Sequence, residues 1–178
     1  GAPGVSTQAA VRYYQLPVTG GTVSASATQA FTYSPESGLH RYMVSGAVDR
    51  AGNFAMGYST SNASTHPGIR YAGRLSTDLA NSITYTERSI IEGTGSQTAT
   101  NRWGDYSAMS LDPDGCTFWF TSGYYAVTGA NTLTRIASFR FPECTTVSTG
   151  TLTGTVRSTA TGTPAIVGAI VTLGSRTT

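Results

Sequence analysis

The stretch TNRWGDYSAMSLDPDGCTFWFTS, residues 100–122, decides the fold. In SAMSL, Met109 and Leu111 alternate with small residues, and in TFWF the two phenylalanines alternate with Trp119; both patterns have the period of half-buried strands. The DPDG between them is typical of a turn, because Asp caps nearby backbone, Pro fixes φ and Gly accepts positive φ. The stretch therefore predicts a loop, a strand, a tight turn and a bulkier second strand.

A weaker copy of this hairpin lies earlier in the chain, at residues 40–61. DRAG at 49–52 aligns with DPDG at 112–115, an offset of 63 residues, and the later segments IRYA and TRIA repeat as well. We interpret the repeat, about sixty residues long, as four antiparallel strands. Repeats of four strands are typical of β-propeller blades. One whole unit spans about 40–92, three strands of another span about 101–142, and half a unit precedes them.

The composition excludes several kinds of catalytic and binding site. Charged residues make up only 11% of the chain, and all eleven basic residues are arginine. The absence of lysine excludes a P-loop lysine, a Schiff-base lysine and a Ser–Lys nucleophile pair. The net charge of +2 is spread along the chain, so no basic patch for nucleic acid is expected. No apolar run is long enough to span a membrane.

The two cysteines, Cys116 and Cys144, are interpreted as a disulfide. Cys116 precedes the strand TFWF, Cys144 follows the strand RIASFRF, and the turn signal Gly-Ala-Asn at 129–131 lies midway between them. The pair is therefore expected to lie across the base of a hairpin, where cross-strand Cβ distances suit a disulfide. Such a bond indicates an oxidising, extracytoplasmic compartment. The alternative is a pair of reduced thiols buried in the core.

Several motifs carry a family resemblance. Residues 110–119 read Ser-x-Asp-x-Asp-Gly-x-Thr-Phe-Trp, which resembles the Asp-box turn of sialidase-like propellers with one extra residue before the glycine. The ordered runs GAVDRAGNFAMGYS, PGIRYAGRL, GTGSQT, NRWGDYSAMSLDP, CTFWFT and RIASFRFPEC resemble the C-terminal blades of large secreted bacterial proteins of that kind. The resemblance covers roughly residues 10–144. It implies an all-β, partial propeller of antiparallel blade-like repeats in a secreted protein, and implies little about activity.

The composition changes after Cys144, so three regions are expected: a repeat region at 1–144, a Thr/Ser-rich linker at 145–150 and a strand pair at 151–178. The last region resembles the opening of a carboxypeptidase regulatory-like β-sandwich. A partial propeller and two sandwich strands leave open edges, so we expect either a fragment of a larger parent chain or completion by another copy. The residues expected to form self-assembly strands are Val156, Ile166, Val167, Ile170, Val171 and Leu173.

The candidate ligand surface is the loop before the hairpin and its counterpart in the earlier repeat. Its residues are Arg102, Trp103, Asp105, Tyr106, Arg41 and Tyr42. An exposed aromatic beside Arg and Asp suits a sugar or a peptide; the alternative is that Trp103 packs between blades while Arg102 pairs with Asp105. Asn62 begins an N-glycosylation sequon, in hosts that use it.

Other chemistry-bearing residues are few. Asp112 and Asp114 are expected to serve the turn, with a calcium site as the alternative. The two histidines lack metal-ligand spacing, so we assign no metal, cofactor or catalytic residue. Arg12, Arg70 and Arg135 recur at one blade position, which favours a structural role; they also resemble the arginines that hold a substrate carboxylate in sialidases.

The sequence thus favours a secreted or cell-surface structural or adhesive protein without enzymatic activity, assembling into an extracellular filament by β-strand donation. Its expected partners are copies of itself or missing parts of a parent chain, and possible glycans. The alternative is a fragment of a sialidase-like glycoside hydrolase or glycan-binding propeller, and a third reading is a proteolytic remnant without a role of its own.

Overall fold

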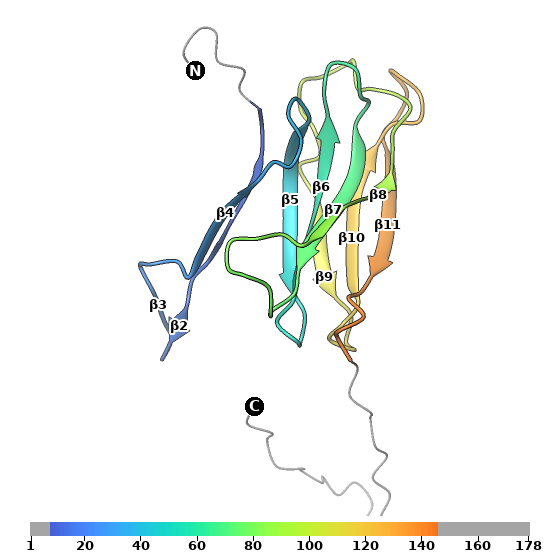
Figure 1. The fold of residues 1–178 in the computed structure, drawn as a ribbon. Helices are drawn as coiled ribbons and strands as arrows, with labels where there is room; N and C mark the ends of the chain where they lie inside the picture. The colour runs from blue at the N-terminus through green and yellow to red at the C-terminus, as the bar shows by residue number, and fades with distance from the viewer. Residues whose placement is uncertain (1–7, 146–178) are drawn as a thin grey trace, which may run out of the picture. The chain divides into compact units, whose positions relative to one another are not determined.

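The computed structural model describes residues 8–145 and is all-β there, as the sequence predicts (Figure 1). No helix in that part of the chain is long and apolar enough to cross a membrane. The strands are β1 (Val11–Gln15), β2 (Val18–Thr19), β3 (Thr22–Val23), β4 (Gln29–Tyr33), β5 (His40–Val48), β6 (Phe54–Ser61), β7 (Gly68–Arg74), β8 (Tyr85–Ile91), β9 (Ala108–Leu111), β10 (Phe118–Tyr124) and β11 (Leu133–Phe139).

The central sheet consists of β5, β6, β7 and β8, paired antiparallel in chain order. This confirms the four-stranded unit expected at about residues 40–92. A bulge shifts the pairing of β5 between Tyr42 and Ser45, and Met43 inside it has a φ of 52°. The bulge re-aims polar groups, as bulges commonly do. The Met43 carbonyl accepts from the Ser107 hydroxyl at 2.8 Å, and the Ser45 hydroxyl accepts from the Met109 amide at 2.9 Å.

The C-terminal sheet has the order β11-β10-β9, again antiparallel. Its β9–β10 hairpin is the one that the stretch 100–122 predicts. Phe118 and Phe120 are buried while Trp119 between them is 41% exposed, so the alternation in TFWF identifies the buried face correctly. Fully burying two phenylalanine side chains contributes about 1.5–3 kcal/mol each to folding.

The N-terminal strands are less regular than the sequence predicts. β1 pairs with β4, joining Val11 to Tyr33. The weak alternation of residues 23–33 predicts one strand, but these residues divide into β3 and β4, and β3 pairs with β2 in a small hairpin. The division occurs at residues 24–28, where the Ser24 hydroxyl accepts from the Ser26 amide at 3.1 Å. Such side-chain bonds to local backbone compete with a sheet ladder.

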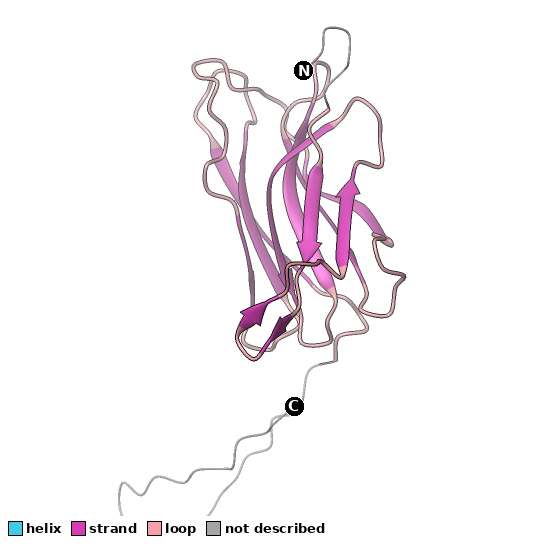
Figure 2. Ribbon diagram, turned by 90° about the vertical axis from the view of Figure 1, so that its left-hand side faces the viewer, coloured by secondary structure: helices cyan, strands magenta, loops and turns pink. Residues whose placement is uncertain are grey.

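The sheets stack in three layers, with the central sheet covered on both faces (Figures 1 and 2). Alternate residues of β6 point to opposite faces, as the period of a strand requires. Met56 and Tyr58 pack with Val11 and Tyr33 of the β1–β4 layer. Ala55 belongs to the second cluster, with the β9–β11 layer. The members of that second cluster are Ala55, Ile69, Met109, Phe118, Phe120 and Phe141.

The strand registers show that the central sheet and the C-terminal sheet are built alike and face the same way in the stack. Phe54 pairs with Arg74 in the central sheet, and its equivalent Phe118 pairs with Phe139, so β11 follows β7 at an offset of 65 residues. Phe54 faces the preceding layer, where the centre of its ring lies 5.0 Å from the centre of the Tyr13 ring. Phe118 likewise faces the layer before its own. This is how successive blades stack in a propeller. Among residues 8–145 the layers close no ring, so the propeller itself remains a prediction.

Candidate functional site

The loop before β9 holds most of the predicted ligand surface, and its tryptophan is packed between layers. The Trp103 indole nitrogen donates to the Ser59 hydroxyl at 3.2 Å. The centre of its ring lies 6.3 Å from the centre of the Tyr42 ring and 5.6 Å from that of Tyr125. Tyr106 is 90% exposed and lies free of that aromatic group. Trp103 therefore couples β5 and β6 to the next layer and is only partly available to a ligand.

The two charged residues of this loop bind each other. The Arg102 guanidinium forms an ion pair and a hydrogen bond with the Asp105 carboxylate. This carboxylate raises the pKa of Arg102 above its ordinary value. The arrangement is the packed alternative that the sequence left open, with Trp103 between layers and Arg102 satisfied within its own loop.

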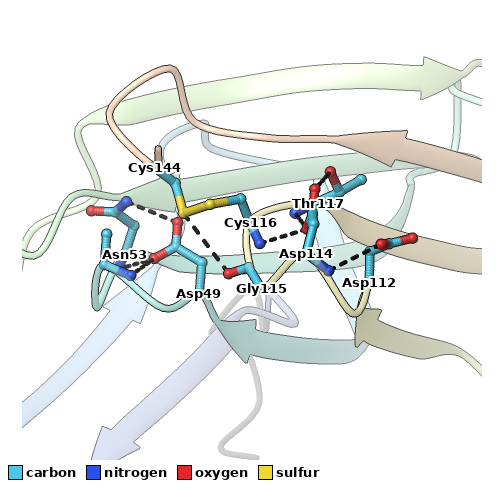
Figure 3. Close-up of a disulfide and its surroundings, with 9 residues drawn as sticks. Asp49, Asn53, Asp112, Asp114, Gly115, Cys116, Thr117 and Cys144 are labelled. Carbon is cyan, nitrogen blue, oxygen red and sulfur yellow. Dashed lines mark hydrogen bonds between the residues drawn. A yellow bond between two sulfur atoms is a disulfide. The ribbon is translucent and has the colours of Figure 1, made fainter. Parts of the chain in front are cut away.

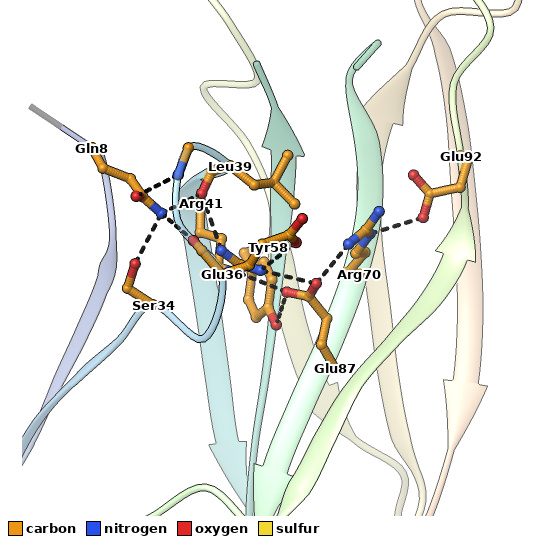
Figure 4. A network of polar contacts seen from close by, with 10 residues as sticks. Gln8, Ser34, Glu36, Leu39, Arg41, Tyr58, Arg70, Glu87 and Glu92 are labelled. Carbon is orange, nitrogen blue, oxygen red and sulfur yellow. Dashed lines mark hydrogen bonds and ion pairs between the residues drawn. The ribbon is translucent and has the colours of Figure 1, made fainter. Parts of the chain in front are cut away.

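Arg41 is a correction to the predicted ligand surface. Its side chain is only 1% exposed, because it points under the β1–β4 layer instead of toward solvent. It donates to both oxygens of Glu87, at 2.7 and 3.1 Å, and to the Leu39 carbonyl at 3.0 Å (Figure 4). A buried arginine satisfied in this way is a structural residue, since a lone buried charge would be strongly destabilising.

Glu87 is the centre of a polar network that crosses the central sheet (Figure 4). It accepts from Arg41 of β5, from the Tyr58 hydroxyl of β6 at 2.8 Å and from Arg70 of β7 at 2.7 Å. Arg70 also pairs with Glu92 at 2.8 Å. Burial would raise the pKa of Glu87, but the hydrogen bonds from Arg41, Arg70 and Tyr58 lower it below its ordinary value. Each strand of the central sheet, from β5 to β8, thus contributes one residue to the network, and the network holds the four strands together.

The three repeated arginines occupy equivalent places and do not meet. Arg12 lies on β1, Arg70 on β7 and Arg135 on β11, one in each layer. Arg12 donates to Tyr14 at 2.6 Å and to Thr32 at 2.5 Å, whereas Arg70 binds two carboxylates. The described residues therefore build no arginine cluster free to hold a substrate carboxylate.

The acidic turn between β9 and β10 uses its carboxylates for its own backbone (Figure 3). Asp114 accepts from the amides of Cys116 and Thr117 at 2.7 and 2.8 Å and from the Thr117 hydroxyl at 2.8 Å. These bonds lower the pKa of Asp114, with the Thr117 amide contributing most. Asp112 accepts from the Asp114 amide at 3.2 Å. Within residues 8–145 no group of acidic, histidine or cysteine side chains is arranged to hold a metal ion.

The predicted disulfide is confirmed. Cys116 and Cys144 are bonded, with a Cα–Cα distance of 5.5 Å (Figure 3). Cys144 lies beyond the end of β11, in a turn that its amide closes on the Phe141 carbonyl at 3.1 Å. The bond therefore fixes the point where the chain leaves the C-terminal sheet.

The sequon residue lies at the end of β6. The Asn62 side-chain oxygen accepts from the Ser64 amide at 2.9 Å and from the Ser64 hydroxyl at 3.1 Å. The Asn62 residue is partly exposed. Glycosylation there stays a prediction. The predicted self-assembly residues, from Val156 to Leu173, lie outside the described residues.

The open edges of the outer sheets are the most distinctive surfaces of residues 8–145. In that part of the chain, β11 pairs only with β10, and β1 pairs only with β4. Leu133 and Ile136 on β11 are 42% and 66% exposed. An edge strand presents unpaired N–H and C=O groups to any strand that can reach it.

A cleft lies beside β11, above β8 of the neighbouring layer. Its volume is about 240 Å³, and Tyr71, Tyr85, Phe139 and Phe141 supply aromatic surface to it. Tyr71 stacks on Phe139 at 4.0 Å. Arg88 and Arg140 also line the cleft, so it is both aromatic and positively charged.

Sequence reasoning did not find Glu87 or the cleft. The glutamate in the middle of YTERSII, the sequence of β8, is a usable signal for an internal ion pair, because buried carboxylates need partners. The cleft depends on two layers meeting and has no local signal.

Comparisons with protein-family models, with curated proteins and with solved structures found no match to this chain. The functional argument therefore depends on the sequence and on the geometry of residues 8–145.

Proposed function

We propose that the chain is a secreted structural or adhesive subunit, without enzymatic activity, that assembles into extracellular filaments by β-strand donation. The disulfide supports an oxidising compartment outside the cytoplasm. The observation that carries the assembly is that both outer layers of the stack have edge strands, among them β1 and β11, with no further strand of residues 8–145 paired to them.

The proposed donor is the apolar tail AIVGAIVTL, residues 165–173. It is free of charge and rich in β-branched residues, which favour a pleated strand. Added to an open edge of another copy, it would satisfy the edge backbone groups and place alternate side chains on the sheet face. Donation of this kind joins two different surfaces, so it propagates as a filament unless its rotation closes a ring.

The alternative of a sialidase-like hydrolase or glycan-binding propeller gains no specific support from the site. Arg70 is occupied by two carboxylates, and Arg102 by one. We therefore propose only the structural function.

The test removes the donor and then alters it by one residue. A chain lacking residues 150–178 is expected to remain monomeric in light scattering and to form no fibres in negative-stain microscopy. Val171→Asp in the full chain is expected to abolish fibres as well, because it places a charge on the strand face that carries Val167 and Leu173. The matched control Thr172→Asp replaces a side chain that is already polar, on the face with Ile166 and Ile170, and should assemble. Fibres formed by the deleted chain would overturn the proposal.

A further inference from the structure

Arg74, the last residue of β7, is a buried cation without a counter-charge. It is only 6% exposed, yet it forms no ion pair with any carboxylate of residues 8–145. The rest of the chain contains no Asp or Glu. Arg41, the other buried arginine of that range, is held by both oxygens of Glu87. Arginine is almost never buried without such a partner, because an unpaired charge in the interior is strongly destabilising.

The hydrogen bonds of Arg74 are also incomplete. Its Nη2 donates to the Asp78 carbonyl at 2.7 Å, and more weakly to the Leu79 carbonyl at 3.5 Å. Its Nε is buried and has no hydrogen-bond partner among residues 8–145, which is rare for a buried polar group. Carbonyl oxygens satisfy N–H groups but supply no full negative charge. An anion is therefore what this guanidinium lacks.

Arg74 lines a pocket of about 170 Å³ between the β1–β4 layer and the central sheet. It pairs with Phe54 of β6, and directly opposite residues of an antiparallel pair point to the same face. Phe54 packs against Tyr13 of β1, with 5.0 Å between the ring centres. Burial raises the pKa of Tyr13, and the positive charge of Arg74 opposes this rise. The charge of Arg74 therefore acts within the pocket.

The walls and the size of the pocket suit a ring. Three aromatic residues, Tyr13, Tyr14 and Phe54, line it. Gln29 lines it as well, but its side-chain oxygen accepts from the Tyr13 hydroxyl and its nitrogen donates to Gln15. An apolar cavity of about 150 Å³ holds one benzene ring. The pocket therefore has room for one six-membered ring with a small substituent.

We propose that this pocket binds a small carboxylic acid with one aromatic ring. The carboxylate lies against the Arg74 guanidinium, whose planar N–H groups match the two oxygens of a carboxylate. The ring lies among Tyr13, Tyr14 and Phe54, where offset or edge-to-face contacts stabilise it. Binding requires one chain only, so it goes beyond the proposed filament and does not depend on assembly.

Benzoate is the probe, titrated into the full-length chain and followed by ligand-observed NMR, which works with single chains and with filaments alike. Benzamide has the same ring and nearly the same shape but no charge, and acetate has the charge but no ring. Benzoate is expected to bind about tenfold or more tightly than benzamide, the difference expected for a hydrogen bond to a charged group. Acetate is expected to bind more weakly than benzoate as well. Equal binding of benzoate and either control, or no binding of benzoate, would overturn the proposal.

Two variants locate the binding. Arg74→Met keeps the apolar stem of the side chain and removes the charge, so it is expected to abolish the preference for benzoate over benzamide. The matched control Arg88→Met removes an exposed arginine that lines the cleft beside β11, and should bind benzoate as the wild type does.

If Arg74→Met fails to fold, Val48→Trp tests the same pocket. Val48 lines the pocket and is 53% exposed, so a larger side chain there fills the pocket from its rim and leaves the core intact. Val48→Trp is expected to lose benzoate binding while keeping the wild-type melting temperature. Wild-type affinity in either pocket variant, or loss of binding in Arg88→Met, would place benzoate elsewhere and overturn the proposal.

Discussion

Glu87→Gln is the substitution expected to disturb the central sheet most. Arg41 is 1% exposed and Glu87 12% exposed, and their two short contacts are shielded from solvent. Removing one partner of a buried ion pair costs about 3–5 kcal/mol, because the other charge remains buried. Glutamine keeps one oxygen acceptor and Arg41 keeps its bond to the Leu39 carbonyl, so we expect the lower end, about 3 kcal/mol. For a domain of this size that lowers the melting temperature by roughly 6–12 °C.

The effect should depend on pH in a defined direction. The pKa of Glu87 in the folded chain is lowered, so its ionised form stabilises the fold above the ordinary carboxyl pKa, and this contribution is lost as pH falls through the lowered value. Urea unfolding at pH 7 should therefore show the full difference between wild type and Glu87→Gln. The difference should shrink as the pH falls through this lowered pKa, because the wild-type carboxyl then becomes neutral as well.

The matched control is Glu92→Gln. Glu92 is 44% exposed and, within residues 8–145, pairs only with Arg70, and exposed ion pairs contribute at most about 1 kcal/mol. If Glu87→Gln destabilises the chain no more than Glu92→Gln does, the reasoning from the buried network is refuted.

Three further predictions concern the packing of the C-terminal sheet. Reduction of the disulfide should lower the free energy of unfolding by roughly 3.5 kcal/mol, given the 28-residue separation of Cys116 and Cys144, measured by urea unfolding with and without reductant. Phe120→Ala should cost about 3–5 kcal/mol, whereas Trp119→Ala on the exposed face should cost clearly less; equal losses in thermal unfolding would contradict the layer assignment. Gly57→Ala should destabilise by about 1–3 kcal/mol, since its Cβ would meet the Phe120 ring at 2.5 Å; a gain in stability would show that the two layers are not in close contact.

The hairpin and its disulfide were predictable because their signals are local. TFWF alternates over consecutive residues, and DPDG folds through side-chain bonds to amides within three residues. Cys116 and Cys144 lie on either side of one recognisable turn. The repeat of Asp49–Gly52 and Asp112–Gly115 was equally readable, and it led to the four-stranded unit.

The remaining features depend on contacts between layers, which no single segment encodes. Arginine is usually a surface residue. Arg41 can be buried because it binds Glu87, which lies 46 residues later in the chain. Trp103 has no signal of its own for packing, because its partner Ser59 belongs to another sheet. The break between β3 and β4 is the exception, because its cause is local: the Ser24 hydroxyl accepts from the Ser26 amide within a stretch whose weak alternation predicts one continuous strand.

Electron microscopy of the protein as purified from its source tests the central claim most directly. Ordered filaments with one 178-residue subunit per repeat, in which tail residues 165–173 lie against a strand edge of the next copy, are the predicted result. Compact single particles, or a heavier parent band by mass spectrometry, would contradict it, because the open edges would then be completed by other parts of one longer chain.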